Sequence, residues 1–500
     1  MKLTIDDSGK RLVVDVAEAS SVLDVLQAHR IDIHATCGGA GTCRRCQVLV
    51  RDAAGLDYRL ACKTPVTDGM EVVVEAVGAI DVVQSGTTRV FPPDDGAVGY
   101  GVAIDIGTTT LVAHLHDLAS GERLATVGRS NPQIAFGSDV ISRISASVDG
   151  KLNLMTAAIQ DAMREMKAKL CKRAGISPDD VSRVAIAGNT VMQHIAVGLP
   201  PDTIGVNPFT PLSLFGDEHV IEGLETCRFA RCIAGYVGGD ITAGMLAREI
   251  DAGGTRLFID LGTNGEMALA ANGRIACCAT AAGPVFEGAN VRFGMPASAG
   301  AISKVSFEGG RVATQVLGDV DPIGVCGTGL IDAVALMVRL GVVDESGYLL
   351  GADELDDELA PLVGREGDRN VFYLTDDKSV YITQDDVRNL QLAKAAVCAG
   401  IMTLADATGT RIEDIESLEI AGGFGAYLNL ASAAEIGLFP EQLLPCASSV
   451  GNTSAEGATA LLVSRAARDR EAEIAGKCDY LELSTSARFN SFYIEMMEFE

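Results

Sequence analysis

The chain contains no tryptophan, and aromatic residues make up only 5% of its 500 residues. It also lacks an excess of basic residues, since 40 Lys or Arg face 67 Asp or Glu and the net charge is −27. A protein that binds nucleic acid needs a basic surface for the phosphate backbone, so this charge argues against nucleic acid as a partner. The acidity lies mostly beyond residue 80, because residues 1–80 hold nine basic against eleven acidic side chains.

Long apolar runs are also missing. No stretch approaches the ~18 consecutive apolar residues that a membrane helix needs, so we expect no membrane span. The first residues, Met1-Lys-Leu-Thr-Ile-Asp-Asp, have neither the basic start nor the apolar segment of a secretory signal. Most of the thirteen cysteines stand singly in apolar runs, as reduced core thiols do. Together these features predict a cytoplasmic protein.

Four cysteines near the N-terminus are spaced in a pattern instead. Cys37, Cys43, Cys46 and Cys62 follow C-x5-C-x2-C-x15-C, with three glycines between the first two. Glycine permits the positive φ angles that a loop needs to turn several thiolates inward. Zinc usually takes paired C-x2-C knuckles, and only one such pair is present. An iron–sulfur cluster is therefore favoured over a zinc ribbon or unrelated core thiols.

The segments around this loop predict a small sheet with one helix. Residues 3–5 and 12–16 alternate as the strands of a hairpin, and Ser20-Ser21 is suited to begin a helix. Residues 47–50 and 70–76 predict further strands. With the cysteine spacing, this resembles the [2Fe–2S] ferredoxin domain with the β-grasp fold, one residue longer in the first gap than the plant-type spacing.

Two later segments repeat one design, Val102-Ala-Ile-Asp-Ile-Gly-Thr-Thr-Thr and Leu257-Phe-Ile-Asp-Leu-Gly-Thr-Asn-Gly. Each is an apolar strand, an Asp and a turn of glycine and hydroxyl residues, followed by a second apolar run. Such a turn exposes backbone N–H groups and hydroxyls, which suits phosphate oxygens. The leading carboxylates, Asp105 and Asp260, can hold Mg²⁺ through water. The pair of hairpins predicts a nucleotide-driven motor or a kinase.

From Tyr100 onward, short apolar strands alternate with amphipathic helices, which is typical of layered α/β architecture. Glycine-rich turns follow several strands, at Gly188-Asn189, Gly422-Gly423 and Gly451-Asn452. Each turn alone is weak evidence for a ligand contact, because strand-to-helix turns use glycine for steric reasons. Their order along the chain after the two hairpins is the stronger evidence.

That order resembles the superfamily of acetate and sugar kinases, heat-shock chaperones and actin, whose duplicated, ribonuclease H-like domains bind ATP. The resemblance assigns to the first phosphate hairpin Asp105, Gly107, Thr108 and Thr109. It assigns to the second hairpin Asp260, Gly262, Thr263 and Asn264. The connecting segments match Gly188-Asn189 and Gly451-Asn452, and the turn against adenosine matches Gly422 and Gly423.

The predicted fold class is therefore α/β and α+β, a β-grasp ferredoxin domain followed by a duplicated actin-like ATPase. We expect the ferredoxin domain at 1–78, a linker at 79–98 and the ATPase at 99–500. Its two subdomains are expected at roughly 99–235 and 236–500.

A ferredoxin domain joined to this ATPase resembles the ATP-dependent reductive activators of corrinoid proteins. The match spans nearly the whole chain and includes Asn131-Pro-Gln, residues 137–143, 236–240 and 280–288. It implies that one electron passes from a [2Fe–2S] cluster to Co(II), giving Co(I), coupled to ATP and Mg²⁺. The implied partners are a corrinoid protein of a methyltransferase system and an upstream low-potential electron donor, and a homodimer is compatible with the family. Better-known members carry an extra small domain where this chain has only its linker.

The candidate catalytic carboxylates are Asp240, Asp260 and Glu266. Asp240 and Glu266 are suited to orient the attacking water or to bind Mg²⁺ indirectly. Asp240 is equally suited to cap a helix that begins at Thr242. Glu287 has two interpretations, a residue of the partner surface and a plain loop charge.

Three other functions stay open. Cys326, before Gly-Thr-Gly, resembles a feature of the activators of 2-hydroxyacyl-CoA dehydratases, in which two ATPase subunits share a [4Fe–4S] cluster. Those proteins lack a ferredoxin domain and need a second ligand cysteine, for which this chain offers no clear match. A small-molecule kinase with a redox-sensing domain would phosphorylate its substrate whatever the state of the cluster. An actin-like assembly module would form filaments with ATP.

Overall fold

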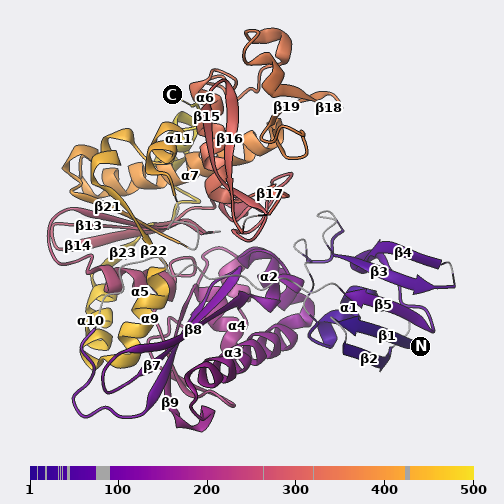
Figure 1. The fold of residues 1–500 in the computed structure, drawn as a ribbon. Coiled ribbons are helices and arrows are strands. Elements are labelled where there is room, and N and C mark those ends of the chain that lie inside the picture. Colours follow the sequence, from indigo (N-terminus) through magenta and orange to yellow (C-terminus); the bar gives the residue numbers. More distant parts are fainter. Residues whose placement is uncertain are drawn as a thin grey trace. The chain divides into compact units, whose positions relative to one another are not determined.

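The computed structural model describes residues 1–7, 10–16, 20–31, 33, 35, 38–41, 46–53, 55–74, 91–262, 264–318, 320–422 and 428–499. The predicted site residues Cys37, Cys43, Thr263 and Gly423, and the first part of the linker, lie outside these residues. The chain forms two compact units (Figure 1). Unit 1 contains the described residues of 1–82 with 91–240 and 458–465, and unit 2 contains those of 241–457 and 466–500.

The N-terminal part of unit 1 is a five-stranded sheet in the order β2-β1-β5-β3-β4, drawn in indigo in Figure 1. Its elements are β1 (Lys2–Asp7), β2 (Lys10–Asp15), α1 (Val22–Ala28), β3 (Gln47–Asp52), β4 (Gly55–Leu60), η1 (Ala61–Lys63) and β5 (Met70–Val74). Strands β1 and β5 run parallel, whereas β1–β2, β3–β4 and β3–β5 are antiparallel. This mixed sheet with one helix confirms the predicted ferredoxin-type fold.

Helix α1 begins where the sequence predicts. The Ser21 hydroxyl accepts a hydrogen bond from the Asp24 N–H at 3.2 Å, and the Asp24 carboxylate accepts one from the Ser21 N–H at 3.3 Å. This capping box satisfies two N–H groups that a helix start otherwise leaves without partners. Apolar residues of the helix, Val22, Leu23 and Leu26, are buried in the core of the unit.

The larger sheet of unit 1 has six strands in the order β10-β11-β9-β6-β7-β8. They are β6 (Tyr100–Ile106), β7 (Thr110–Asp117), β8 (Arg123–Ser130), β9 (Val181–Gly188), β10 (Glu218–Ile221) and β11 (Glu225–Phe229). The accompanying helices are η2 (Pro132–Ala135), α2 (Val140–Ala146), α3 (Leu152–Ala174) and α4 (Thr190–Val197). Helix α3 ends at Gly175, whose φ of 71° supplies the left-handed cap.

Unit 2 repeats the same strand plan in the sheet β22-β21-β12-β13-β14-β23. Its strands are β12 (Arg256–Asp260), β13 (Glu266–Ala271), β14 (Arg274–Ala279), β21 (Ser417–Ala421), β22 (Ala447–Gly451) and β23 (Cys478–Tyr480). In both sheets three consecutive antiparallel strands are joined by a parallel strand beside the first of them, β9 beside β6 and β21 beside β12. The repeated plan confirms the predicted duplication of an actin-like fold.

Two smaller sheets and several helices complete the described part of unit 2. The sheets are β16-β15-β17 and β18-β19-β20, formed by β15 (Ala301–Glu308), β16 (Arg311–Val316), β17 (Gly324–Val325), β18 (Val363–Glu366), β19 (Arg369–Tyr373) and β20 (Tyr381–Thr383). The helices are α6 (Gly327–Arg339), α7 (Gln384–Thr408), α8 (Leu430–Glu435), α10 (Arg465–Gly476) and α11 (Ala487–Glu495). Helices α5 (Gly239–Arg248) and α9 (Thr453–Val463) each have residues in both units, and α10 has its first residue, Arg465, in unit 1.

Among the described residues, one helix, α7, is long and apolar enough to cross a membrane. However, 78% of its apolar window is buried inside the protein, and Leu390, Val397 and Leu404 belong to the core of unit 2. Burial of this kind is typical of the central helix of a globular domain.

His114, one of the two buried histidines of β7, predicts a pH dependence of stability. Burial lowers the pKa of His114 from its ordinary value of 6.5 to about 3, with smaller contributions from Arg123 and His116. Its Nδ1 lies 2.9 Å from the Thr126 hydroxyl. Between pH 6.5 and pH 3, His114 is protonated in the unfolded chain and neutral in the folded chain. The full stability is therefore present above pH 6.5 and falls as the pH decreases towards 3.

The loss at pH 5 is about 2 kcal/mol, from roughly 1.4 kcal/mol per unit of pH. We therefore expect the free energy of unfolding, measured in urea, to fall less between pH 7 and pH 5 in His114→Gln than in the unaltered protein. An equal fall in both proteins would contradict this account of His114.

Candidate functional site

Two of the four predicted cluster ligands lie side by side in the described residues. Strands β3 and β4 pair Gln47 with Leu60, and this register places Cys46 opposite the start of η1, which carries Cys62. The Ala61 N–H donates to the Cys46 carbonyl at 2.7 Å, which closes the end of the hairpin. The β3–β4 hairpin therefore brings together two cysteines that are sixteen positions apart.

The sulfur atoms of Cys46 and Cys62 are 3.4 Å apart. A disulfide would place them about 2.05 Å apart. Two thiolates on one tetrahedral ion, with metal–sulfur bonds of about 2.3 Å, lie roughly 3.8 Å apart. The observed distance is close to the second value, so this pair fits two ligands of a single metal ion.

Three glycines of the loop from Cys37 to Cys46, which we call the cysteine loop, have the positive φ angles that the sequence predicts. Gly38, Gly39 and Gly41 have φ values of 61°, 98° and 83°. A side chain at Gly39 would come within 3.3 Å of Leu23 on α1, and its β-carbon would lie 3.9 Å from that of Cys62. These glycines let the loop pass close to both the helix and the ligand.

The first phosphate hairpin joins β6 to β7. Three successive backbone carbonyls of its turn, at residues 107–109, accept hydrogen bonds from two buried residues. Asn131 donates from Nδ2 to the Gly107 carbonyl and from its backbone N–H to the Thr109 carbonyl, both at 2.8 Å. Arg143 donates from Nη2 to the Thr108 carbonyl at 2.6 Å. Because C=O and N–H point to opposite sides of a planar peptide, fixing these carbonyls also fixes the directions of the N–H groups in the turn.

The connecting segment lies against this hairpin. Strands β6 and β9 pair Ile106 with Gly188, and a side chain at Gly188 would meet the Ile106 carbonyl oxygen at 2.8 Å. Asn189 caps α4 through its Oδ1 and donates from Nδ2 to the Thr108 hydroxyl at 3.0 Å. Asp105, which is 7% exposed, is the last residue but one of the same strand β6, directly before Ile106.

Asp240 also reaches the connecting segment. A β-carbon at Gly238 would lie 2.5 Å from the Asn189 Cα and 2.7 Å from the Asp240 Oδ1, so the two residues flank this glycine closely. The prediction that the following helix begins at Thr242 is wrong, because α5 begins at Gly239. Asp240 lies in the first turn, where an acidic side chain interacts favourably with the helix dipole.

The second hairpin, in unit 2, brings two of the predicted catalytic carboxylates together. Strands β12 and β13 place Asp260 directly opposite Glu266. Side chains at such positions have β-carbons about 4.5–5.5 Å apart, and two like charges there repel each other. Glu266 is 4% exposed, so the pair lies in an environment where a bound cation would be strongly favoured.

Gly422 lies against the same hairpin. Its φ is 123°, and a side chain there would clash with the Leu261 carbonyl and approach the Asp260 Oδ1 to 3.4 Å. The Gly422 N–H donates to the Gly451 carbonyl at 3.1 Å. The structure therefore places Gly422 next to both the second hairpin and Gly451.

Three residues near the hairpins were not among the predicted site residues. Asn131 and Arg143 are fully buried behind the first hairpin, and Glu287 places its Oε1 3.8 Å from where a β-carbon at Gly262 would lie. In the sequence, Asn131 shows only that an Asn precedes a Pro, which is typical of a helix cap. Arg143 shows only that an Arg follows Asp139 by four residues. Neither signal identifies the hairpin as the partner.

Cys326 has the environment of a core thiol. It is 3% exposed, and its sulfur donates to the Ile302 carbonyl at 3.4 Å. The structure thus gives no support to a cluster ligand at this position.

Comparisons with known proteins identify the family to which the chain belongs. The profile of a 2Fe-2S iron-sulfur cluster binding domain matches residues 5–67, the RACo middle region matches 100–253, and the C-terminal domain of RACo, the ASKHA domain, matches 254–500. The chain is 30% identical to the corrinoid activation enzyme RamQ of Eubacterium limosum, over 96% of each protein. The chain belongs to this family of corrinoid activation enzymes.

Two further relatives are similar to this chain over most of its length. The [Co(II) methylated amine-specific corrinoid protein] reductase of Methanosarcina barkeri is 26% identical over 79% of the chain and 76% of the relative. The solved structure of a reductive activator for corrinoid, iron-sulfur protein is 29% identical with a TM-score of 0.73, covering 99% of this chain and 98% of that one. The predicted family, the ferredoxin domain and the actin-like ATPase of this activation enzyme are thereby confirmed.

Proposed function

We propose that this protein reductively activates a corrinoid protein by passing one electron from its N-terminal cluster to Co(II), which becomes Co(I), at the expense of ATP. The observation that carries the proposal is that one chain combines a close pair of cysteines in a ferredoxin-type fold with two β-hairpins of the same design. A kinase needs the hairpins without the cysteines, and a ferredoxin needs the cysteines without the hairpins.

The cysteines Cys37, Cys43, Cys46 and Cys62 would hold the [2Fe–2S] cluster, which supplies single electrons near −400 mV when bound. Reducing a corrinoid cobalt that lies 100–200 mV lower costs roughly 2–5 kcal/mol per electron. A nucleotide that binds two conformations of the protein with different affinity can supply this amount. ATP is therefore the source of the driving force in the proposed reaction.

The proposed nucleotide contacts follow from the two hairpins. The turns at Gly107–Thr109 and Gly262–Asn264 would donate N–H and hydroxyl groups to phosphate oxygens, and Gly422-Gly423 would lie against adenosine. Asp105 and Asp260 would hold Mg²⁺ through water. Asp240 and Glu266 would orient the attacking water, with support from the closeness of Asp240 to Asn189 and of Glu266 to Asp260.

We further propose a cytoplasmic location, a low-potential donor that reduces the cluster again after each turnover, and a corrinoid protein of a methyltransferase system as the partner. The location is supported by the eleven described cysteines, all of which are free thiols. A homodimer is the oligomeric state that we propose from the family resemblance, and sedimentation of the purified protein would test it.

The direct test mixes the dithionite-reduced protein with a Co(II) corrinoid protein under anaerobic conditions, with and without MgATP. We expect the Co(I) absorption band to form only with ATP, and at most one Co(I) per reduced cluster in a single turnover. Phosphorylation of a small molecule without any Co(I) would favour the kinase alternative and contradict the proposal.

A further inference from the structure

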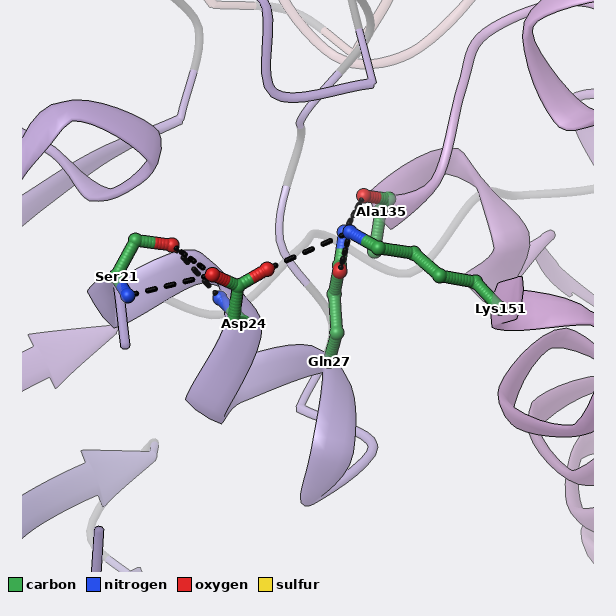
Figure 2. A network of polar contacts seen from close by, with 5 residues as sticks. All are labelled: Ser21, Asp24, Gln27, Ala135 and Lys151. Carbon is green, nitrogen blue, oxygen red and sulfur yellow. Dashed lines mark hydrogen bonds and ion pairs between the residues drawn. The ribbon is translucent and has the colours of Figure 1, made fainter. Parts of the chain in front are cut away.

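Helix α1 of the ferredoxin domain carries a buried polar side chain whose hydrogen bonds go to the ATPase part of unit 1. Gln27 is 2% exposed. Its Nε2 donates to the Ala135 carbonyl, and its Oε1 accepts from Lys151 Nζ at 2.9 Å (Figure 2). A buried amide is costly without partners, so these two bonds stabilise the docked arrangement of the domain.

Two charged pairs surround this amide. Lys151 Nζ also lies 3.4 Å from Asp24, whose carboxylate belongs to the capping box of α1, as Figure 2 shows. Arg30, just after α1, pairs with Asp161 on α3. We call this set the docking contact. It consists of Asp24, Gln27 and Arg30 on one side and Ala135, Lys151 and Asp161 on the other.

Gly38, a described residue of the cysteine loop, lies close to the same segment of the ATPase part. A β-carbon at Gly38 would lie 3.0 Å from the Phe136 carbonyl oxygen, and Phe136 follows Ala135 directly. The next glycine, Gly39, is held close to Leu23 of α1. Gln27 of α1 and Gly38 therefore contact two consecutive residues, Ala135 and Phe136.

The other end of that segment holds the first phosphate hairpin. Asn131 fixes the carbonyls of Gly107 and Thr109, as described above. Gln133 accepts from Arg143 Nη1 at 3.3 Å, and Arg143 fixes the Thr108 carbonyl. Residues 131–136, which we call the relay segment, thus join the phosphate turn to the cysteine loop within six residues.

We propose that Gln27 and Lys151 are positioning residues that couple nucleotide binding at the first hairpin to the cysteine loop through the relay segment. Phosphates that engage the N–H groups of the turn also orient its carbonyls, and these are the atoms that Asn131 and Arg143 hold. Coupling between two sites is reciprocal, so the docking contact in turn strengthens nucleotide binding by the same factor. This inference rests on the proposed function, because it takes ATP and a cluster as the ligands of the two sites.

The test uses the full, cluster-loaded chain and measures hydrogen–deuterium exchange with and without a non-hydrolysable ATP analogue and Mg²⁺. The variants are Gln27→Ala, Lys151→Met and the double variant. The matched control is Lys172→Met, which makes the same substitution at the exposed C-terminal end of the helix that follows Lys151. Iron content and the exchange of the β1–β5 sheet report whether the ferredoxin domain is folded.

In the unaltered protein and the control, we expect the analogue to slow exchange both at residues 107–109 and in α1. In the Gln27→Ala and Lys151→Met variants, protection at 107–109 persists, protection of α1 is lost, and the Kd of the analogue rises about fivefold or more. The double variant should be little worse than either single variant, because both remove one contact.

Protection of α1 that survives in the variants, or an α1 that never responds although residues 107–109 do, would overturn the coupling alone. If the analogue leaves residues 107–109 unprotected in the unaltered protein, the nucleotide site itself is wrong, and the proposed function falls with the coupling.

Discussion

Replacing Cys46 with serine is expected to abolish the cluster and with it all reduction of the corrinoid partner. Cys46 is 1% exposed and lies 3.4 Å from Cys62, so a hydroxyl would leave one thiolate without its counterpart at the metal ion. We expect iron to fall from about two atoms per chain to near zero, as a [2Fe–2S] cluster requires. Iron analysis and the visible absorption of anaerobically purified protein measure this loss.

The matched control is Cys446→Ser, which alters a partly exposed thiol that donates to the Leu443 carbonyl at 3.3 Å. This variant should keep its iron and its colour. A Cys46→Ser protein that retains a full complement of iron would show that the cysteine pair is not part of the cluster site. ATP hydrolysis without partner should survive in Cys46→Ser, because both hairpins are intact.

Replacing Asp260 with alanine is expected to have the opposite effect to Cys46→Ser. The protein keeps its cluster, and ATP no longer stimulates the reduction of the partner. Asp260 faces Glu266 across the second hairpin and lies against Gly422. Removing a group that helps to stabilise the developing charge in such a site costs on the order of 10²–10³ in rate. We expect ATP hydrolysis and ATP-dependent Co(I) formation to fall by at least about a hundredfold.

Asp479→Ala is the control for this change, because Asp479 lies on β23 of the same sheet with its side chain 53% exposed, paired with Arg274. It should leave both rates unchanged. Undiminished stimulation by ATP in Asp260→Ala would remove the second hairpin from the proposed mechanism.

Local patterns allowed much of the fold and site to be predicted. The hairpins around Asp105 and Asp260 are encoded within residues 100–117 and 256–271, since a strand, a turn and a returning strand follow one another in the chain. The spacing of the cysteines predicted a metal site, and the register of Gln47 with Leu60 shows how Cys46 and Cys62 meet.

Long-range contacts could not be predicted in the same way. Arg143 acts on the Thr108 carbonyl 35 residues earlier, and an Arg in a short helix gives no sign of that partner. Gln27 occupies a helix position that a polar residue usually exposes, and its burial follows from contacts more than 100 residues away in the sequence. The helix start at Gly239 was missed because glycine is a poor helix former, and the favourable place of Asp240 in the first turn outweighs that preference.

The central claim is that ATP drives a single electron from the N-terminal cluster to a corrinoid cobalt. Electron paramagnetic resonance tests it most directly, because the reduced [2Fe–2S] cluster and Co(II) are both paramagnetic and both signals disappear when the electron moves. In a frozen mixture of reduced protein and Co(II) corrinoid protein, we predict that both signals persist without ATP and decay together, one spin for one spin, after MgATP is added. Loss of the cobalt signal while the cluster signal stays constant would contradict the account.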